Sequence, residues 1–445
     1  MPTQINEIHM IYSLNTQEAA PSISKHGPNP SHTPANLRVL VLDEEIPYPP
    51  NAGKRIRTWN LLRYLAKRHS ITLLCYGCPT DPAATALQNA GISLRFVEPR
   101  EIFSSWRLYL SLFANLFSPY PFSVTKHYSS RFKKKLDALL EYESWDLIHC
   151  EWTPYARFIP SDCRLPVLIS AHNIESEILA LRARYSRTPI AKVFFWLQEW
   201  KMRRFERESL RRASGVASVA KNDFEVMRSW GVESISLVPN GVDLPAYSAN
   251  QDAEHDDEIL MLGSLDWYPN ADSLNYFIQE IFPIVRERRP GAKLRIVGRR
   301  PPQSLKKRCS KIPGVDFVGE VGHVNDYLAR ATIVVVPLRI GGGSRLKILE
   351  ALAAGKAVVS TSIGAAGLEL VSGEHLIIAD SPSEFAASVE RLLASSEERH
   401  QLAAQGRLQV KQRYGWPEIA KLLENAWYQV SKKATSVIRG FGLRP

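Results

Sequence analysis

The segment GGGSRLKILEALAAG, residues 341–355, combines residue types that could bind a phosphate. It follows the apolar run TIVVVPL and precedes the apolar run AVVSTS, so we expect a strand, a glycine-rich turn and a helix in this order. The glycines Gly341, Gly342 and Gly343 would let the backbone approach a ligand closely. A helix that begins near Ser344 would point unpaired N–H groups at the same place. The first expectation is therefore an anion site.

The predicted helix carries Arg345, Lys347 and Glu350 beside this turn. At about 100° per residue, Lys347 and Glu350 share one face of the helix. A lysine near a diphosphate supplies positive charge, and a carboxylate one turn later can accept two hydrogen bonds from the vicinal diol of a ribose. A nucleoside diphosphate would satisfy both side chains. A surface ion pair between them is the alternative that these residues alone leave open.

Other candidate residues come directly after apolar runs. Gly53 lies in the loop PPNAGK, where the backbone can approach a diphosphate. His172 follows PVLISA and could donate to a sugar hydroxyl. Gly263 and Ser264 follow ILML, and Arg299 follows KLRIVG, where a guanidinium could hold a phosphate. The alternatives are a loop cap, a structural histidine and a solvated loop.

Composition narrows the class of protein. The chain has 445 residues, enough for two or more domains with separate cores. Its 56 Lys+Arg against 45 Asp+Glu give a net charge of +11, which favours phosphates, nucleic acid or an anionic membrane surface as partners. No RNA- or DNA-binding motif is found in the sequence, so we expect no nucleic-acid partner.

Cysteine usage and hydropathy predict the compartment. Five cysteines without a secretory signal favour a reducing environment, and Cys75 and Cys78 are expected to be buried thiols rather than a metal or redox site. The polar residues 1–35 are predicted to be a disordered extension. No apolar run is long enough to span a bilayer. We therefore expect a cytoplasmic protein, with peripheral contact at the inner face of the cytoplasmic membrane left open.

Strand and helix patterns alternate along the whole chain, which predicts an α/β fold with parallel sheets. The pattern restarts after the acidic stretch 248–258, which we expect to be an exposed linker. Strands are expected at 37–43, 70–77, 94–98, 145–151, 166–172 and 215–220, then at six runs from ILMLGS to HLIIAD, with helices at 55–68 and 416–433. Two Rossmann-like domains facing across a cleft follow from this pattern: an extension at 1–35, an N-terminal domain at 36–240, a C-terminal domain at 241–415, and a helix with a tail at 416–445 that crosses back to the first domain.

Several segments, taken in this order, resemble the retaining GT-B glycosyltransferases of family 4: PPNAGKRIRTWNLLRYLA, SAHNIESE, VPNGVD, GSLDWYPN, KLRIVG and the whole run from TIVVVPL to GAAGLEL. The resemblance covers about residues 37–430. It implies that the N-terminal domain, 36–240, binds the acceptor and that the C-terminal domain, 241–415, binds the nucleotide sugar. It implies that Glu350 binds the ribose of a nucleotide sugar and that Lys347 or Arg345 meets the diphosphate. It also implies that Gly53 lies near donor and acceptor and that His172 contacts the transferred sugar.

The resemblance implies transfer from a UDP- or GDP-sugar to a hydroxyl of a glycan or lipid-linked acceptor, with retention of configuration, in cell-surface polysaccharide or glycolipid biosynthesis. No Asp-x-Asp motif follows a strand, so no metal and no other cofactor is expected. The implied catalytic residues are His172, Lys347 and Glu350, and the implied donor site comprises Gly53, Gly263, Ser264, Arg299, Gly341, Gly342, Gly343, Ser344, Arg345, Lys347 and Glu350.

Some alternatives stay open. Many family members carry a glutamate where this chain has Gly342, which leaves open a catalytically degenerate GT-B scaffold. A GT-B-shaped nucleotide-sugar 2-epimerase would use the same donor without an acceptor. A basic, aromatic helix expected over 182–212 could lie on a membrane or pack on its domain. The apolar segment 103–122, next to the basic run RFKKK, could likewise meet a membrane or pack within its domain.

Overall fold

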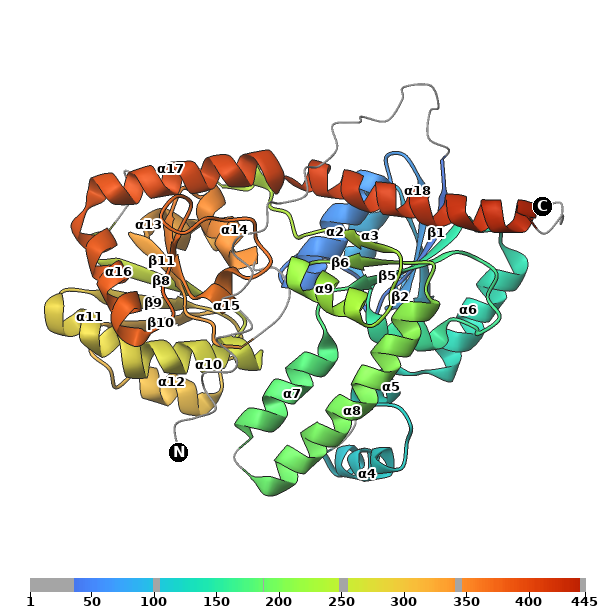
Figure 1. Ribbon diagram of the computed structural model, residues 1–445, viewed down its shortest axis with the longest axis horizontal. Coiled ribbons are helices and arrows are strands. Elements are labelled where there is room, and N and C mark those ends of the chain that lie inside the picture. Colours follow the sequence, from blue (N-terminus) through green and yellow to red (C-terminus); the bar gives the residue numbers. More distant parts are fainter. Residues whose placement is uncertain (1–35, 99–104, 187, 248–254, 341–345, 441–445) are drawn as a thin grey trace. The chain divides into compact units, whose positions relative to one another are not determined.

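The structure is a computed structural model that describes residues 36–98, 105–186, 188–247, 255–340 and 346–440. Its strands form two separate sheets, and every strand pairing in the described ranges is parallel (Figure 1). Two parallel-sheet α/β domains confirm the predicted fold class. The predicted extension at 1–35 lies outside the described residues.

The N-terminal sheet has seven strands in the order β3-β2-β1-β4-β5-β6-β7. Val39 and Val41 of β1 pack under α2 (Gly53–Leu65), whereas Leu40 and Leu42 pack under α6 (Ser130–Tyr142). Both faces of the sheet are therefore covered, which is why its strands read as continuous apolar runs. The strands are β1 (Arg38–Leu42), β2 (Ser70–Tyr76), β3 (Ile92–Val97), β4 (Leu147–Cys150), β5 (Val167–Ala171), β6 (Gly215–Ser218) and β7 (Ile235–Leu237).

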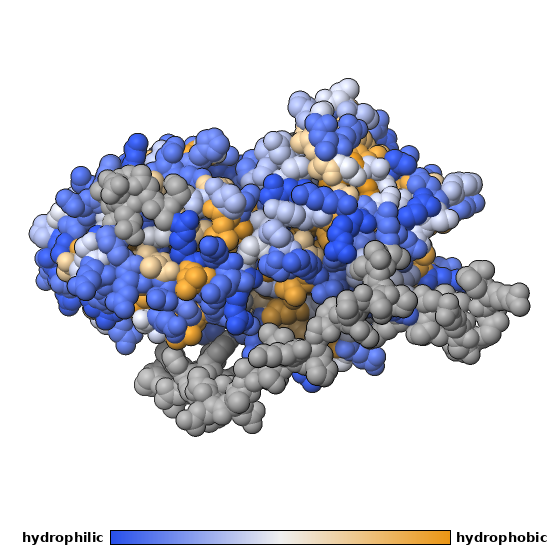
Figure 2. Space-filling model, turned by 90° about the horizontal axis from the view of Figure 1, so that it is seen from above, coloured by the Kyte–Doolittle hydropathy of each residue, from blue (hydrophilic) through white to orange (hydrophobic). Residues whose placement is uncertain are grey.

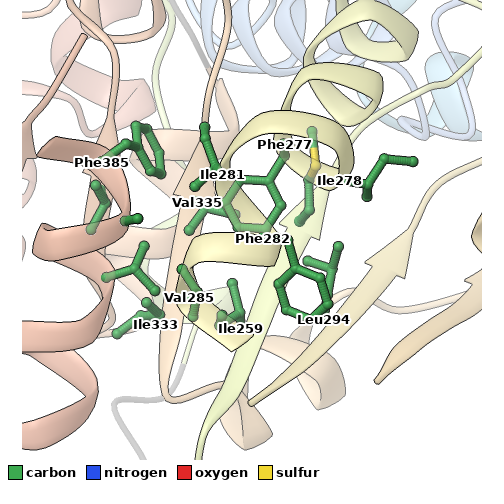
Figure 3. Close-up of a cluster of buried hydrophobic side chains, with 14 of the residues drawn as sticks. Ile259, Phe277, Ile278, Ile281, Phe282, Val285, Leu294, Ile333, Val335 and Phe385 are labelled. Atoms are coloured by element: carbon green, nitrogen blue, oxygen red, sulfur yellow. The ribbon is translucent and has the colours of Figure 1, made fainter. Parts of the chain in front are cut away.

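The C-terminal sheet has six strands in the order β10-β9-β8-β11-β12-β13. Figure 3 shows the core on one of its faces, where Phe277, Phe282 and Phe385 meet the aliphatic side chains of β8, β9 and β11. The other face is covered by α14 (Leu346–Ala353), so this helix is held against the sheet. The strands are β8 (Glu258–Leu262), β9 (Lys293–Val297), β10 (Val315–Gly319), β11 (Ile333–Val336), β12 (Ala357–Ser360) and β13 (Ile377–Ile378).

The last helix, α18 (Trp416–Gly440), packs against α2 and the strands β4 to β7 of the N-terminal sheet. Trp416 and Trp427 are fully buried there. Just before this helix, the carbonyl of Tyr414 accepts a hydrogen bond of 2.7 Å from the backbone N–H of Val242. The two segments that connect the sheets therefore run side by side at this point.

The remaining helices lie around the two sheets (Figure 1). They are α3 (Pro82–Asn89), α4 (Ser105–Leu116), α5 (Phe122–His127), α7 (Glu175–Tyr185), α8 (Pro189–Arg212), α9 (Lys221–Ser229), α10 (Tyr268–Tyr276), α11 (Phe282–Arg288), α12 (Gln303–Cys309), α13 (Asn325–Arg330), α15 (Ser362–Ala365), α16 (Pro382–Ala394) and α17 (Ser396–Arg413). The face shown in Figure 2 is mainly hydrophilic, with hydrophobic residues in separate patches.

Two predictions about secondary structure were wrong. The basic segment 182–212 is not one helix but the end of α7 and the whole of α8. Thr188 caps α8 and Pro189 is its first residue. Proline is favoured at the first position of a helix, because an N–H group there would have no partner within the helix. The three residues of β7 were not expected, because so short a strand shows no periodicity.

Two predictions about exposure were also wrong. Glu258 does not belong to an exposed linker: it opens β8 and is buried, because Nε and Nη2 of Arg295 donate to its two carboxylate oxygens at 3.0 Å each. Residues 248–254 of that predicted linker lie outside the described residues. Cys75 is buried as predicted, but Cys78 is exposed because β2 ends at Tyr76.

Candidate active site

Lys347 and Gly263 come together at the carboxyl end of β8. Lys347 lies near the start of α14, and its Nζ donates to Oδ1 of Asn270 at 2.7 Å. Asn270 is itself fixed, because its Nδ2 donates to the carbonyl of Ser264 at 2.8 Å. A Cβ on Gly263 would lie 3.0 Å from Lys347 Nζ and from the Asn270 amide. A side chain larger than glycine would therefore push the lysine away.

A second glycine supports this close packing. A Cβ on Gly298, directly after β9, would lie 1.9 Å from the carbonyl oxygen of Gly263, far inside van der Waals contact. The backbones of these two loops approach as closely as they do because both positions are glycine. Gly298 did not stand out in the sequence, since a single glycine after a strand is a weak signal.

Ser264 and Arg299 are also brought together. Arg299 Nε donates to the hydroxyl of Ser264 at 2.6 Å, and that hydroxyl donates to Oδ1 of Asp266 at 2.8 Å. The three side chains form a chain of polar groups at the edge that carries Gly263. By accepting from Ser264, Asp266 holds the turn that follows β8.

Glu350 is partly buried, one turn after Lys347 on α14. The hydroxyl of Tyr247 donates to its Oε1 at 3.1 Å. Burial raises the pKa of the Glu350 carboxyl to about 7, and the Tyr247 hydrogen bond and the Lys347 charge offset this only in part. Burial also raises the pKa of Tyr247, so its hydroxyl stays protonated and acts as the donor. Tyr247 is a partner of Glu350 that the sequence did not reveal.

The glycine-rich turn itself cannot be placed beside these groups. Gly341, Gly342, Gly343, Ser344 and Arg345 lie outside the described residues. Their predicted contacts with a diphosphate remain predictions.

Gly53 opens α2 at the carboxyl end of β1. The helix has no side-chain cap and no acidic residue in its first turn, a favourable arrangement for an anion. The adjacent Lys54 is already engaged: its Nζ lies 2.5 Å from Asp43 Oδ1 and 2.9 Å from Glu44 Oε1. Burial raises the pKa of Asp43 to about 6, although Lys54 opposes this. The cationic charge of Lys54 is therefore balanced within the protein.

His172 lies just beyond β5 with a small exposed fraction. Its Nε2 is 2.6 Å from the backbone carbonyl oxygen of Glu151. A carbonyl only accepts, so Nε2 carries a proton. The backbone of Glu151 thus orients the ring of His172.

The side chain of Glu151 is fully buried among polar groups that the sequence did not connect. Its Oε2 lies 3.0 Å from His149 Nε2, and its Oε1 accepts from Thr58 Oγ1 at 3.0 Å. Burial alone would raise the pKa of Glu151, but hydrogen bonds from His149 and His172 hold that pKa well below its usual range. Glu151 therefore links α2, β4 and the loop after β5 as an ionised carboxylate.

Arg57 lies beneath this cluster and is 1% exposed. Its Nη1 donates to the carbonyl of Pro239 at 2.8 Å and to Oδ1 of Asn240 at 3.1 Å, whereas Nε and Nη2 have no hydrogen-bond partner among the described residues. Burial lowers the pKa of Arg57 to about 10, and the charge of Glu151 offsets part of this. The helix α2 is thereby tied to the connection between the two sheets.

The helix α7 begins after Ile174, whose apolar side chain does not cap it. Instead, the buried Glu206 of α8 accepts from the backbone N–H groups of Glu175 and Ser176 at 2.7 and 3.0 Å.

Nowhere in the described ranges do three or more His, Cys, Asp or Glu side chains gather in a way that could hold a metal ion.

Two family profiles divide the chain between its sheets. The profile described as Glycosyltransferase Family 4 matches residues 53–245, and that described as Glycosyl transferases group 1 matches residues 256–395. The chain belongs to the GT-B glycosyltransferases. The first profile includes β2 to β7 of the N-terminal sheet and the second includes the whole C-terminal sheet, so both halves of this glycosyltransferase carry the family pattern.

Curated relatives agree with this assignment. The glycosyltransferase is 23% identical to an uncharacterized 44.6 kDa protein in the cps region of Klebsiella pneumoniae, over 79% of this chain and 90% of the relative. It is 26% identical to the phosphatidyl-myo-inositol mannosyltransferase of Mycobacterium tuberculosis, over 50% of this chain and 62% of that protein.

A solved structure shows the same fold. Anabaena HepE, in complex with UDP and glucose, superimposes with a TM-score of 0.62 over 88% of this chain and 99% of HepE, at 14% identity. The likeness extends over both sheets and supports the GT-B architecture.

Proposed function

We propose that this enzyme transfers a sugar from a UDP- or GDP-sugar to a hydroxyl of a glycan or lipid-linked acceptor, with retention of configuration. The observation that carries the proposal is the grouping of Lys347, Gly263 and Glu350 at one end of the C-terminal sheet. The lysine suits a diphosphate and the carboxylate suits a ribose diol. The presence of UDP in the HepE complex favours a uridine nucleotide.

In the proposed reaction, the bond between the anomeric carbon and the diphosphate oxygen breaks as the acceptor oxygen bonds to the same face of the sugar. The acceptor proton passes to the departing phosphate oxygen, so no separate carboxylate nucleophile is needed. Lys347 would stabilise the negative charge that develops on the nucleoside diphosphate. His172 would contact a hydroxyl of the transferred sugar, with its ring oriented by the hydrogen bond from Nε2 to the backbone of Glu151.

The proposal includes independence of a metal ion, because the lysine supplies the charge that a metal would otherwise supply. It also includes a role in making cell-surface polysaccharide or glycolipid. The lipid substrate named for the mycobacterial relative supports a lipid-linked acceptor and contact with an anionic membrane. No described helix is long and apolar enough to cross a membrane.

A thermal-shift panel with UDP, GDP, ADP and their sugars tests the donor site. A bound nucleotide at 100 times its Kd should stabilise the protein by about 2.7 kcal/mol. Glu350→Ala should lose most of this response, whereas the exposed control Glu225→Ala on α9 should keep it. If no nucleotide raised the Tm, or if Glu350→Ala responded like wild type, the donor site would be misassigned. Epimerised donor formed without any acceptor would instead indicate a 2-epimerase.

A further inference from the structure

A buried carboxylate on α8 faces the start of α7. Glu206 is 1% exposed and lies one turn from Met202 and one turn from Leu210, on the buried face of its helix. A carboxylate in such a place costs free energy unless hydrogen-bond donors meet it. Its two oxygens accept from the backbone N–H groups of Glu175 and Ser176, at 2.7 and 3.0 Å. A side chain of α8 is therefore bound to the backbone of α7.

Glu206 supplies a cap that the residue before α7 does not. That residue is Ile174, whose side chain cannot accept a hydrogen bond. The first N–H groups of a helix have no partner within the helix and favour a negative charge beside them. Burial raises the pKa of Glu206 to about 8, and the charge of Glu175 adds to this, whereas hydrogen bonds from α7 offset part of it. Above this pH an ionised Glu206 caps α7.

The start of α7 determines where His172 lies. Residues 172–174 connect the end of β5 at Ala171 with the start of α7 at Glu175. Ala171 is 1% exposed and Ile174 is 2% exposed, so both ends of this short connection are fixed in the core. A shift of the first turn of α7 would therefore move His172.

The same connection is tied to the end of β4 at two points. Nε2 of His172 lies 2.6 Å from the backbone carbonyl oxygen of Glu151. Nε1 of the next residue, Trp152, donates to Oε1 of Glu175 at 3.1 Å. Figure 1 shows α7 and α8 side by side, so the start of α7 is held from β4 through Trp152 and from α8 through Glu206.

We propose that Glu206 is a positioning residue, which holds His172 in place through the first turn of α7. Glu206 is too deeply buried to touch a sugar. Its loss would free two N–H groups of α7 and let the first turn of that helix shift, and His172 would shift with it. The inference rests on the sugar contact proposed for His172 and adds the group that fixes the position of this side chain.

The NMR signal of the His172 imidazole, assigned by its loss in His172→Ala, reports this position in the free protein. The spectra are recorded at about pH 9, where Glu206 is mostly ionised. Glu206→Ala should shift the signal, and Glu206→Gln, which keeps one acceptor oxygen, should shift it less. The exposed control Glu208→Ala on the same helix should leave it unchanged. An unchanged signal in Glu206→Ala would overturn the proposal.

Binding of UDP and of UDP-glucose to the full chain separates positioning from a general loss of structure. His172→Ala should reduce the preference for UDP-glucose over UDP by about fivefold, the worth of one hydrogen bond. Glu206→Ala should cause a similar reduction and keep its affinity for UDP within about twofold of wild type. The double variant should lose no more than either single variant, because Glu206 acts through His172.

Two binding results would overturn the role of Glu206: additive losses in the double variant, and an equal loss of affinity for UDP and UDP-glucose in Glu206→Ala. Failure of the proposed function would look different. If the His172 signal moves in Glu206→Ala while neither single variant changes the preference for UDP-glucose, the positioning holds and the sugar contact of His172 is wrong.

Discussion

Two carboxylates that the protein shields from water, Glu151 in the N-terminal domain and Glu350 in the C-terminal domain, differ in the direction of their pKa shifts. Glu151 is surrounded by hydrogen-bond donors from His149, His172 and Thr58, and its pKa lies well below the usual range. Within the described ranges Glu350 accepts from one side chain, that of Tyr247, and burial raises its pKa to about 7. Desolvation acts on both, so the number of donors decides the sign of the shift.

This difference separates structure from ligand binding. The hydrogen-bonding capacity of Glu151 is taken up by the protein itself, which suits a group that fixes His172 and α2. Glu350 has fewer donors from the protein, and ribose hydroxyls would supply the donors that favour its ionised form. We therefore expect Glu151 to contribute chiefly to stability and Glu350 chiefly to nucleotide affinity.

The largest expected effect is that of Glu151→Ala. It would take the buried acceptor away from the Thr58 hydroxyl and leave His149 with Ser170 alone, and we expect the free energy of unfolding to fall by about 3–5 kcal/mol. Chemical denaturation at neutral pH measures this. The control Glu143→Ala removes only a partly exposed ion pair with Arg95 and should cost less than about 1 kcal/mol. A similar loss in both variants would contradict the role of Glu151.

The same variant carries a pH signature. The folded-state pKa of Glu151 lies below its ordinary value of 4.5, so its contribution is present above that pH and is lost as the pH falls toward the folded-state pKa. The gap in unfolding free energy between wild type and Glu151→Ala should therefore narrow in acid. A gap that stayed constant down to about pH 3 would argue against an ionised Glu151.

A smaller effect is expected from Gly298→Ala. Its Cβ would displace the carbonyl of Gly263 and with it the neighbours of Lys347, which should cost about 1–3 kcal/mol and weaken nucleotide binding. A Cβ added at Gly322 would meet no atom within 4 Å, so Gly322→Ala is the matched control and should leave both properties nearly unchanged. Calorimetric titration and thermal unfolding of the two variants decide the point.

A still smaller effect is expected from Tyr247→Phe. It removes the Tyr247 hydroxyl that donates to Glu350, which should raise the pKa of that carboxyl above about 7 and cost about 1 kcal/mol of stability. The pH midpoint of nucleotide-sugar binding should move upward accordingly. A midpoint that stayed in place would show that Tyr247 does not influence Glu350.

Periodicity in the sequence predicted the strands other than β7. It also placed Lys347 and Glu350 on the same face of one helix. It also placed Gly263 and His172 correctly at the ends of strands. It could not connect Glu151 with Thr58, or Glu350 with Tyr247, since these pairs lie 93 and 103 positions apart. Such contacts depend on how helices pack on a sheet, which leaves no local pattern. In the sequence, Glu151 stood out only as the acidic residue at the end of the predicted strand WDLIHCE.

The same limit explains the errors at Glu258 and Cys78. A glutamate at the end of an acidic stretch reads as exposed, and only the distant Arg295 shows why it is buried. A cysteine two residues after a strand reads as its continuation, although the strand has already ended. The polarity of a segment thus predicts that a side chain is exposed only where no residue from another helix or strand pairs with that side chain.

The most direct test of the donor site is calorimetric binding of UDP-glucose between about pH 5.5 and 8.5 to wild type and Glu350→Gln. The phosphates of this ligand do not titrate in that range, so a pH dependence reports on the protein. Wild-type affinity should fall by about tenfold as the pH drops below about 7, because the protonated carboxyl is a poorer acceptor for the ribose hydroxyls. Glu350→Gln should bind more weakly at high pH and show a flat profile. Equal affinity and an identical pH profile in both proteins would contradict the assignment of Glu350 to the nucleotide.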